Sequence, residues 1–272
     1  MGAMEIRAYA AAVIEASTLE GKLAASPTFL SDADPGVPVR YVEPVRPPGL
    51  EFVPGASPKV PAAAGMCDPS QRPRILHALA NHELQAAELF AWALLAFPDA
   101  PKAFRQGLVK ILGDEQRHCR LYLDRLAAMG AAFGDYPVSG LFWRRVPEMD
   151  SPLAFVCTMG LTYENANLDF ALEHVVAARA NGDEATARVL EQVHDEEIAH
   201  VAFAWRWMRA FKDAETSDWE TFVAAGPRHA AERARGATFD RPGRERAGLD
   251  AAFIARLEGT RPTAPGGKPR SA

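Results

Sequence analysis

One pattern of acidic residues and histidines occurs twice in this chain at nearly the same spacing, and it constrains the fold more than any other feature. A glutamate lies 32 residues before a Glu-x-x-His motif in the first half and 33 residues before another in the second half. Residues three apart lie on one face of a helix, so each motif can offer one metal ion a carboxylate oxygen and an imidazole nitrogen. The six residues of the pattern are Glu83, Glu115, His118, Glu164, Glu197 and His200.

Apolar periodicity and helix-breaking residues predict four long helices that carry this pattern, over residues 74–97, 102–129, 151–180 and 184–211. Short turns at 98–101 and 181–183 predict two antiparallel hairpins. The 20 residues from Ala131 to Asp150 can reach roughly 60 Å, more than the length of a 28-residue helix. Two hairpins with one long crossover predict an all-α, ferritin-like four-helix bundle.

The remaining sequence predicts extensions on both sides of the bundle. Residues 4–25 are amphipathic and predict a helix, whereas the proline-rich stretch from Ser26 to Pro73 can be neither regular helix nor central strand. We expect this stretch to wrap the bundle or to be partly disordered. After Lys212 we expect two short helices and a disordered tail over 260–272. The predicted segments are therefore 1–72, the di-metal bundle 73–212, and 213–272.

The heights and faces of the four glutamates agree with a shared site. The midpoint of Glu83 and Glu115 is position 99, and that of Glu164 and Glu197 is 180.5, so both midpoints fall at the predicted turns. Each lone glutamate is therefore level with its partner motif. Apolar residues flank all four at helical spacing, which points the carboxylates into the core. Four unpaired buried carboxylates would be very costly, and two divalent cations would neutralise them.

A rival register and a chance arrangement were the alternatives. Glu191 and His194 form a third Glu-x-x-His, 27 residues after Glu164, and Glu88 precedes Glu115 by the same spacing. This register fails because its midpoint, 177.5, lies within the third helix, and because charged residues flank Glu191. The other alternative is the chance burial of unrelated polar residues. Four carboxylates and two imidazoles suit iron or manganese better than zinc or copper.

Three segments carry a resemblance to a known family: NHELQAAELFAWALLAFPDAP, DEQRHCRLYLDRL and DEEIAHVAFAWRW. Over residues 73–212 the chain resembles the ferritin-like di-iron carboxylate superfamily, and within it an uncharacterised family of bacterial ferritin-like proteins. It is more distantly similar to the di-iron monooxygenase that hydroxylates a modified adenosine in tRNA. The resemblance implies the same six residues as ligands of two ions, with Glu115 or Glu197, or both, as bridges.

The resemblance also assigns roles to three neighbours of the ligands. Asp114 matches the aspartate that orients a histidine in many members, whereas the helix predicted over 184–211 has Glu196 at this position. The alternative for both is a solvated helix charge. His194 matches the extra histidine ligand of some di-iron N-oxygenases, although a hydrogen-bonded helix histidine is the preferred interpretation.

These features predict an oxygen-dependent oxidase or hydroxylase that contains two Fe ions, or Mn and Fe, and uses O2 as co-substrate. The organic substrate is unknown, and an external electron donor is required because no flavin or Fe–S motif is visible. The extensions are expected to shape a pocket or the face of a homodimer. The alternatives are a ferroxidase, peroxide-scavenging or iron-handling protein, a tRNA-modifying hydroxylase, and a non-enzymatic, metal-stabilised helical module.

Composition adds broader limits. The net charge of −5 gives no sign of a nucleic-acid surface, although it leaves tRNA open. The longest apolar run is too short to span a bilayer, and no signal peptide is visible. Three distant cysteines do not form a disulfide framework. We therefore predict a cytoplasmic protein without a membrane partner.

Overall fold

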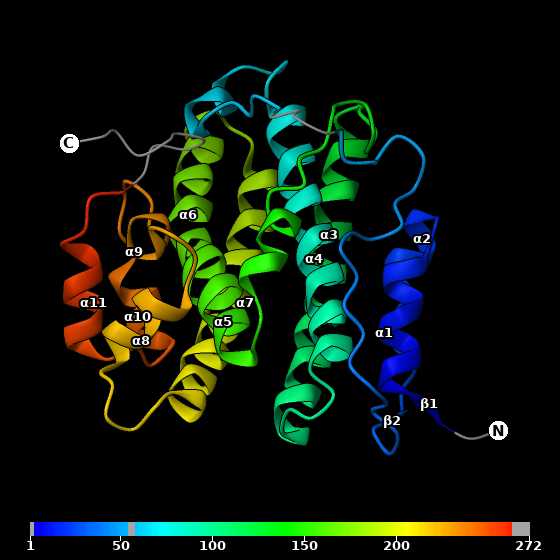
Figure 1. Cartoon of the computed structure of the whole chain (residues 1–272). Coiled ribbons are helices and arrows are strands. Elements are labelled where there is room, and N and C mark those ends of the chain that lie inside the picture. The colour runs from blue at the N-terminus through cyan, green and yellow to red at the C-terminus, as the bar shows by residue number, and fades with distance from the viewer. Residues whose placement is uncertain (1–2, 54–57, 263–272) are drawn as a thin grey trace. The chain divides into compact units, whose positions relative to one another are not determined.

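The fold is all-α, as predicted, in a computed structural model that describes residues 3–53 and 58–262 (Figure 1). Within these residues, strand is limited to one pair of two-residue segments. The chain forms two compact units, one of Met1–Pro61 with Asp68–Val146 and one of Ala62–Cys67 with Pro147–Ala272. Each unit contains one of the two predicted helical hairpins.

The first unit is built on the hairpin of α3 (Arg72–Ala96) and α4 (Lys102–Ala128). Helix α1 (Ile6–Glu15) packs against α3, and the short α2 (Leu19–Lys22) follows it. The strands β1 (Met4–Glu5) and β2 (Leu30–Ser31) pair in parallel, with Met4 opposite Leu30. The α3–α4 hairpin was predicted to within two residues at each end.

The prediction of one N-terminal helix over residues 4–25 was wrong, because the chain breaks between α1 and α2. Ala16 leaves the helical region with a ψ of 125°. The Thr18 hydroxyl then caps α2 by accepting a hydrogen bond from the Gly21 backbone N–H at 3.1 Å. Threonine competes for backbone donors in this way, which favours a new helix start over continuation.

The described part of the proline-rich stretch wraps α1 and α3 within the first unit. The Val39 N–H donates to Leu95 O at 2.9 Å, and the Val45 N–H donates to Ile14 O at 3.1 Å. The Trp92 indole donates to Tyr41 O at 3.0 Å. Because proline removes backbone donors, this stretch is fastened by isolated hydrogen bonds and side chains instead of a ladder. Its last part includes the 3₁₀ helix η1 (Ala63–Cys67), which belongs to the second unit.

The long connection between the hairpins starts at a glycine C-cap. Gly130 has a φ of 74°, and the Ala131 N–H reaches back to Leu126 O, which ends α4. The predicted loop from Ala131 to Asp150 is largely irregular but contains the 3₁₀ helix η2 (Trp143–Glu148).

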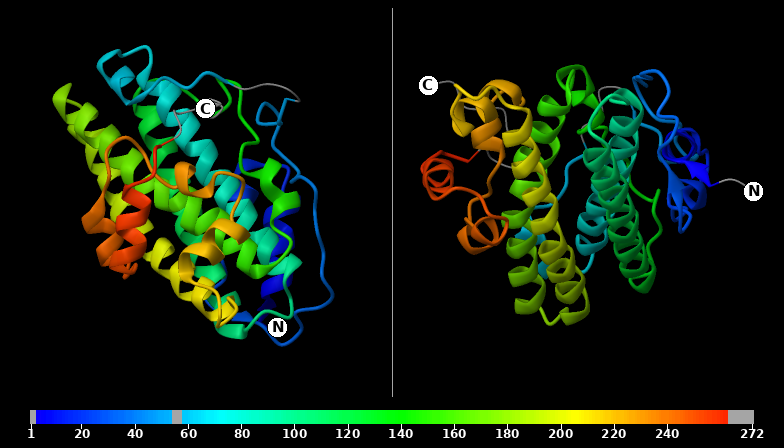
Figure 2. Two further views of the ribbon diagram at one scale, coloured as in Figure 1. Left: turned by 60° about the vertical axis from the view of Figure 1, so that its left-hand side comes forward. Right: turned by 90° about the horizontal axis from the view of Figure 1, so that it is seen from below.

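The second unit is built on a hairpin whose first arm has three parts: α5 (Pro152–Thr158), the π-helical η3 (Met159–Glu164) and α6 (Asn165–Ala180). Helix α7 (Glu184–Phe211) returns after a short turn, visible in both views of Figure 2. The Asp183 carboxylate caps α7 by accepting from the Thr186 N–H at 3.1 Å. The predicted limits of both arms are confirmed, but the π-helical segment was not expected.

The C-terminal extension contains four short helices in the described residues, so the expectation of two was wrong. Aspartate and serine N-caps start several of them, including the capping box of Ser217 and Glu220. The tail was expected to be disordered, and its residues 263–272 lie outside the described part. The four helices are α8 (Asp218–Ala225), α9 (Ala230–Arg233), α10 (Arg241–Arg246) and α11 (Ala251–Glu258).

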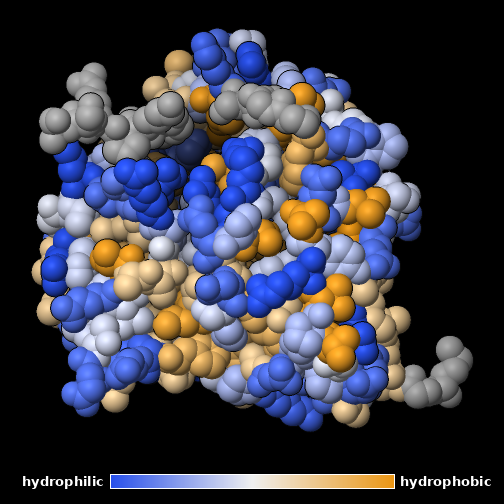
Figure 3. All heavy atoms as spheres, in the orientation of Figure 1, coloured by the Kyte–Doolittle hydropathy of each residue, from blue (hydrophilic) through white to orange (hydrophobic). Residues whose placement is uncertain are grey.

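Hydrophilic and hydrophobic residues are interspersed over the face shown in Figure 3. Of the described helices, none is both long enough and apolar enough to span a lipid bilayer. Most of the large apolar side chains that are exposed belong to the proline-rich stretch: Phe29, Val37, Val42, Val45, Val53 and Val60.

Candidate metal centre

The hairpin of the first unit brings together Glu83 from α3 with Glu115 and His118 from α4. All three side chains are buried. The His118 Nδ1 lies 3.6 Å from Glu83 Oε2 and 3.8 Å from Glu115 Oε2. Each residue offers a ligand atom within 4.8 Å of the others. We call these three residues the first half-site.

The hairpin of the second unit repeats the arrangement with Glu164 at the end of η3 and Glu197 and His200 on α7. All three are buried. The His200 Nδ1 lies 3.2 Å from Glu197 Oε2, and a ligand atom from each residue lies within 4.8 Å of the others. We call these residues the second half-site. Each half-site thus contains two glutamates and one histidine, in the same order along the chain.

The separations within each half-site fit a common divalent cation. First-row metals bind carboxylate oxygen and imidazole nitrogen at about 2.0–2.2 Å, so two ligands of one ion lie about 3 to 4.3 Å apart. The Glu–His distances of 3.2, 3.6 and 3.8 Å fall in this range. Two carboxylates and one imidazole are also a donor set that iron and manganese accept. The residues present therefore fit a metal ion in each half.

The π-helical turn positions Glu164. The turn occupies Met159–Glu164, and the Thr162 hydroxyl within it donates a hydrogen bond of 2.8 Å to Cys157 O in the preceding helix, α5. Gly160 lies so close to α7 that a Cβ on it would be 2.1 Å from the Ala204 Cβ. The missing side chain thus lets η3 approach α7 where the second half-site forms. π-Helical turns are frequent at functional sites.

The predicted neighbours of the ligands have partners of their own. The Asp114 carboxylate pairs with Arg117 at 2.8 Å, and Glu196 accepts a hydrogen bond from Gln192 at 3.1 Å. The buried His194 shares a hydrogen bond of 2.9 Å with Asp240, as expected of a hydrogen-bonded helix histidine. Burial would raise the pKa of Asp240, but hydrogen bonds from His194 and from the Gly243 N–H lower it overall.

Among the residues of the rival register, Glu191 lies in a different environment from the candidate ligands. Glu191 lies at the surface of the second unit and forms a two-point ion pair with Arg179, at 2.9 and 2.7 Å. This ion pair is the main cause that lowers the pKa of Glu191. The side chain is 42% exposed, so Glu191 is engaged at the surface while the candidate ligands are buried.

A buried amide anchors α4 between its two candidate ligands. Gln116 donates to Lys22 O at 2.9 Å, and its oxygen accepts from the Tyr9 hydroxyl at 3.0 Å. The N-terminal helices therefore contact the ligand-bearing segment of α4 directly. No sequence pattern predicted this role for Gln116 or Tyr9.

Two further carboxylates, Glu88 on α3 and Asp169 on α6, are fully buried. The sequence suggested Glu88 only as a member of the rival register and did not suggest Asp169 at all. Each lies five residues after the lone glutamate of its half-site. The sequence shows this repeated offset, but the two carboxylates lie outside the helix face that carries the candidate ligands, so the pattern of ligands did not predict a role for them.

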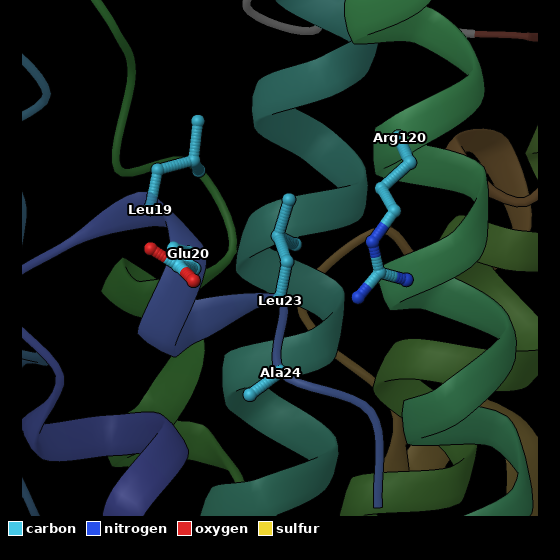
Figure 4. A pocket seen from close by; sticks show the side chains of 5 residues that line it. All are labelled: Leu19, Glu20, Leu23, Ala24 and Arg120. Atoms are coloured by element: carbon cyan, nitrogen blue, oxygen red, sulfur yellow. The ribbon is translucent and has the colours of Figure 1, made fainter.

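A surface hollow of about 390 Å³ lies between α2 and α4 of the first unit (Figure 4). Leu23 and Ala24 lie at its centre, with the Glu20 carboxylate on one side and the Arg120 guanidinium on the other. None of the six candidate ligands lines this hollow, so it does not identify a substrate cavity beside them.

One family model matches this chain, over residues 4–255, and its description is "Protein of unknown function (DUF455)". The chain belongs to this family. The match begins at β1 and ends within α11, so the DUF455 unit includes both extensions as well as the two hairpins. No curated protein and no solved structure matches the chain. The similarity to the ferritin-like superfamily stays a prediction from the motifs.

Proposed function

We propose that the two half-sites join to hold two metal ions, Fe–Fe or Mn–Fe, and that the protein uses them with O2 to oxidise or hydroxylate an organic substrate. One observation carries this proposal: two hairpins of the same chain each bury one lone glutamate beside a Glu-x-x-His pair. This is the donor pattern of di-iron carboxylate bundles, one glutamate from each of two helices and Glu-x-x-His from the other two.

The charge of the buried groups supports the metal. Each half-site places two carboxylates in a buried position within 4.8 Å of an imidazole. Desolvating carboxylates is expensive unless opposite charge compensates them. One divalent cation per half-site supplies that charge, and the neutral imidazole completes its coordination without adding more.

The chain's own residues would contribute placement and a dry environment. An iron pair, when bound, supplies electrons for the reduction of O2. Glu83, Glu115 and His118 would hold one ion, and Glu164, Glu197 and His200 the other. Burial of all six excludes bulk water. The DUF455 match covers segments outside the two hairpins. A storage cage needs little more than the bundle, whereas such segments can shape a substrate pocket, so we favour catalysis on an organic substrate over iron storage.

The experiment is the metal content of the purified protein after exposure to Fe(II) or Mn(II), followed by O2 consumption. We expect two ions per chain and iron-dependent O2 uptake. Glu115→Gln and Glu197→Gln should each lose at least one ion. Glu191→Gln is the matched control, because it makes the same change in the third Glu-x-x-His at the surface.

Four results would contradict the proposal. Wild-type protein without bound metal would remove the site, and equal loss of metal in the Glu191→Gln control would remove its assignment to these ligands. Two bound ions that are inert toward O2 would leave a metal-stabilised helical module. Assembly into a large shell that accumulates iron would instead favour the storage alternative.

A further inference from the structure

Each extension contacts the hairpin of its unit through a buried arginine–carboxylate ion pair. In each unit, an arginine from an extension forms an ion pair with a buried carboxylate on the hairpin arm that carries the lone glutamate. Arg46 of the proline-rich stretch pairs with Glu88 on α3, and Arg244 of α10 pairs with Asp169 on α6. Both carboxylates lie five residues after the lone glutamate of their half-site.

The contacts around Glu88 join four segments of the first unit. Arg46 Nη2 lies 2.7 Å from Glu88 Oε2, and the Trp143 indole donates to the same oxygen at 3.0 Å. Lys22 Nζ lies 3.0 Å from Glu88 Oε1. The Arg46 guanidinium also stacks over the Phe52 ring, 4.3 Å from its centroid. Glu88 thus attaches three other segments to α3: α2, the proline-rich stretch, and the long connection between the two hairpins.

The contacts around Asp169 reproduce this plan in the second unit. The Arg244 guanidinium donates to both Asp169 oxygens, at 2.7 and 3.0 Å, and to Asn165 O at 3.0 Å. The backbone N–H of Gly236 donates to the same carboxylate at 2.8 Å. Arg244 also stacks over an aromatic ring, that of Phe239, at 4.0 Å from its centroid. Both sites therefore combine a buried carboxylate with a stacked arginine.

The offset of five residues gives the pairs a geometric consequence. At about 100° per residue, the buried carboxylate lies about 140° around the helix from the lone glutamate and about 7.5 Å farther along the axis. The arginine therefore holds the side of the helix away from the metal ligand. A rotation of about 10° at a side-chain radius of about 5.5 Å would move the ligand by about 1 Å. An ion pair that prevents this rotation fixes the position of the ligand.

Stability alone is a weak reason for such pairs. Buried ion pairs are often matched or exceeded in stability by apolar residues of similar volume, and their best-attested use is to specify register. We propose that Arg46 and Arg244 are positioning residues, which fix the rotation of α3 and α6 and thereby the aim of Glu83 and Glu164. This inference rests on the proposed function, because it concerns the same metal ligands.

The partners of Arg46 described above belong to the first unit and those of Arg244 to the second, so each arginine should influence one half-site. Arg46→Met should weaken the ion held by the first half-site, and Arg244→Met the ion held by the second. Loss of groups that orient metal ligands directly typically lowers affinity about 10- to 100-fold, and we expect an effect near the lower end of this range for these indirect positioning residues. The matched control is Arg179→Met, which removes the exposed two-point ion pair with Glu191.

The test is a titration of full-length variants with Co(II), whose visible absorption reports the geometry of its ligands, together with thermal unfolding. We expect two Co(II) ions in wild type and in Arg179→Met. Each buried variant should lose at least tenfold affinity for one ion and show a changed absorption band. Arg46→Lys and Arg244→Lys keep the charge but not the forked geometry. They should recover most of the melting temperature and little of the Co(II) affinity.

The outcomes distinguish a failure of the proposed function from a failure of the positioning role alone. Wild type that binds no Co(II) would overturn the proposed function and this inference with it. If wild type binds two ions and the folded variants bind both with unchanged affinity and spectrum, only the positioning role fails. The same holds if the lysine variants recover affinity and melting temperature together, because the pairs would then be purely structural. If the methionine variants do not fold, the lysine variants decide.

Discussion

Replacing Gly160 with alanine should destabilise the second unit and disturb its half-site. The new Cβ would meet the Ala204 Cβ at 2.1 Å, whereas non-bonded carbons pack at about 3.5–4.0 Å. The π-helical segment would therefore have to move away from α7 by about 1.5 Å, carrying Glu164 with it. Overpacking of this kind typically costs about 1–3 kcal/mol.

Gly113 provides the matched control for this substitution. It lies inside α4, two residues before Glu115, and a Cβ on it would meet no atom within 4 Å. Alanine in a helix interior is more stable than glycine by about 0.5–1 kcal/mol. Gly113→Ala should therefore raise the melting temperature by about 1–4 °C, whereas Gly160→Ala should lower it by about 2–12 °C.

Scanning calorimetry is the appropriate assay, because it resolves the two units if they unfold separately. Metal titration of the same samples should show weaker binding in Gly160→Ala and unchanged binding in Gly113→Ala. If Gly160→Ala melts at or above the wild-type temperature, the close approach of η3 to α7 is not the constraint described above.

Three further predictions concern other parts of the molecule. Burial lowers the pKa of His77 to about 4 in the folded chain, whereas in the unfolded chain it stays near 6.5. Between these pH values the unfolded chain binds a proton that the folded chain does not. Stability should fall as the pH drops from 6.5 to 4, and His77→Gln, which can still accept from the Gly134 N–H, should flatten this dependence in urea unfolding. Ser151→Ala removes the N-cap of α5 and should cost about 1 kcal/mol by thermal unfolding; no change would argue against the cap. Glu88→Ala leaves two buried cations without their carboxylate and should cost about 3–5 kcal/mol, whereas Glu191→Ala should cost less than about 1 kcal/mol; similar losses would contradict the difference in burial.

The long helices were predictable because single residues near their ends, which the sequence shows, determine where they begin and end. Asp183 caps α7, and Gly130 ends α4 in the left-handed region, so both boundaries follow from single residues. The N-terminal break was missed because apolar periodicity continues through Thr18, and the hydroxyl cap outweighs that periodicity. The helices of the C-terminal extension are short, and periodicity identifies such elements poorly.

The clustering of the candidate ligands within each hairpin was predictable for a different reason. Their types, spacing and faces repeat between the two hairpins, so one half serves as a check on the other. The π-helical turn before Glu164 was not predictable in this way, because the spacing of side chains does not reveal a change in backbone hydrogen bonding. The Arg46–Glu88 and Arg244–Asp169 pairs depend on contacts between segments distant in sequence, which only the three-dimensional structure provides.

The proposed function requires that the two half-sites act as one dinuclear centre. Electron paramagnetic resonance of the Mn(II)-loaded protein tests it most directly, because two close Mn(II) ions couple magnetically. We predict two ions per chain and a coupled spectrum, which Glu83→Gln and Glu164→Gln each convert to that of a single ion. Two uncoupled ions per chain, or no bound ion, would contradict the claim.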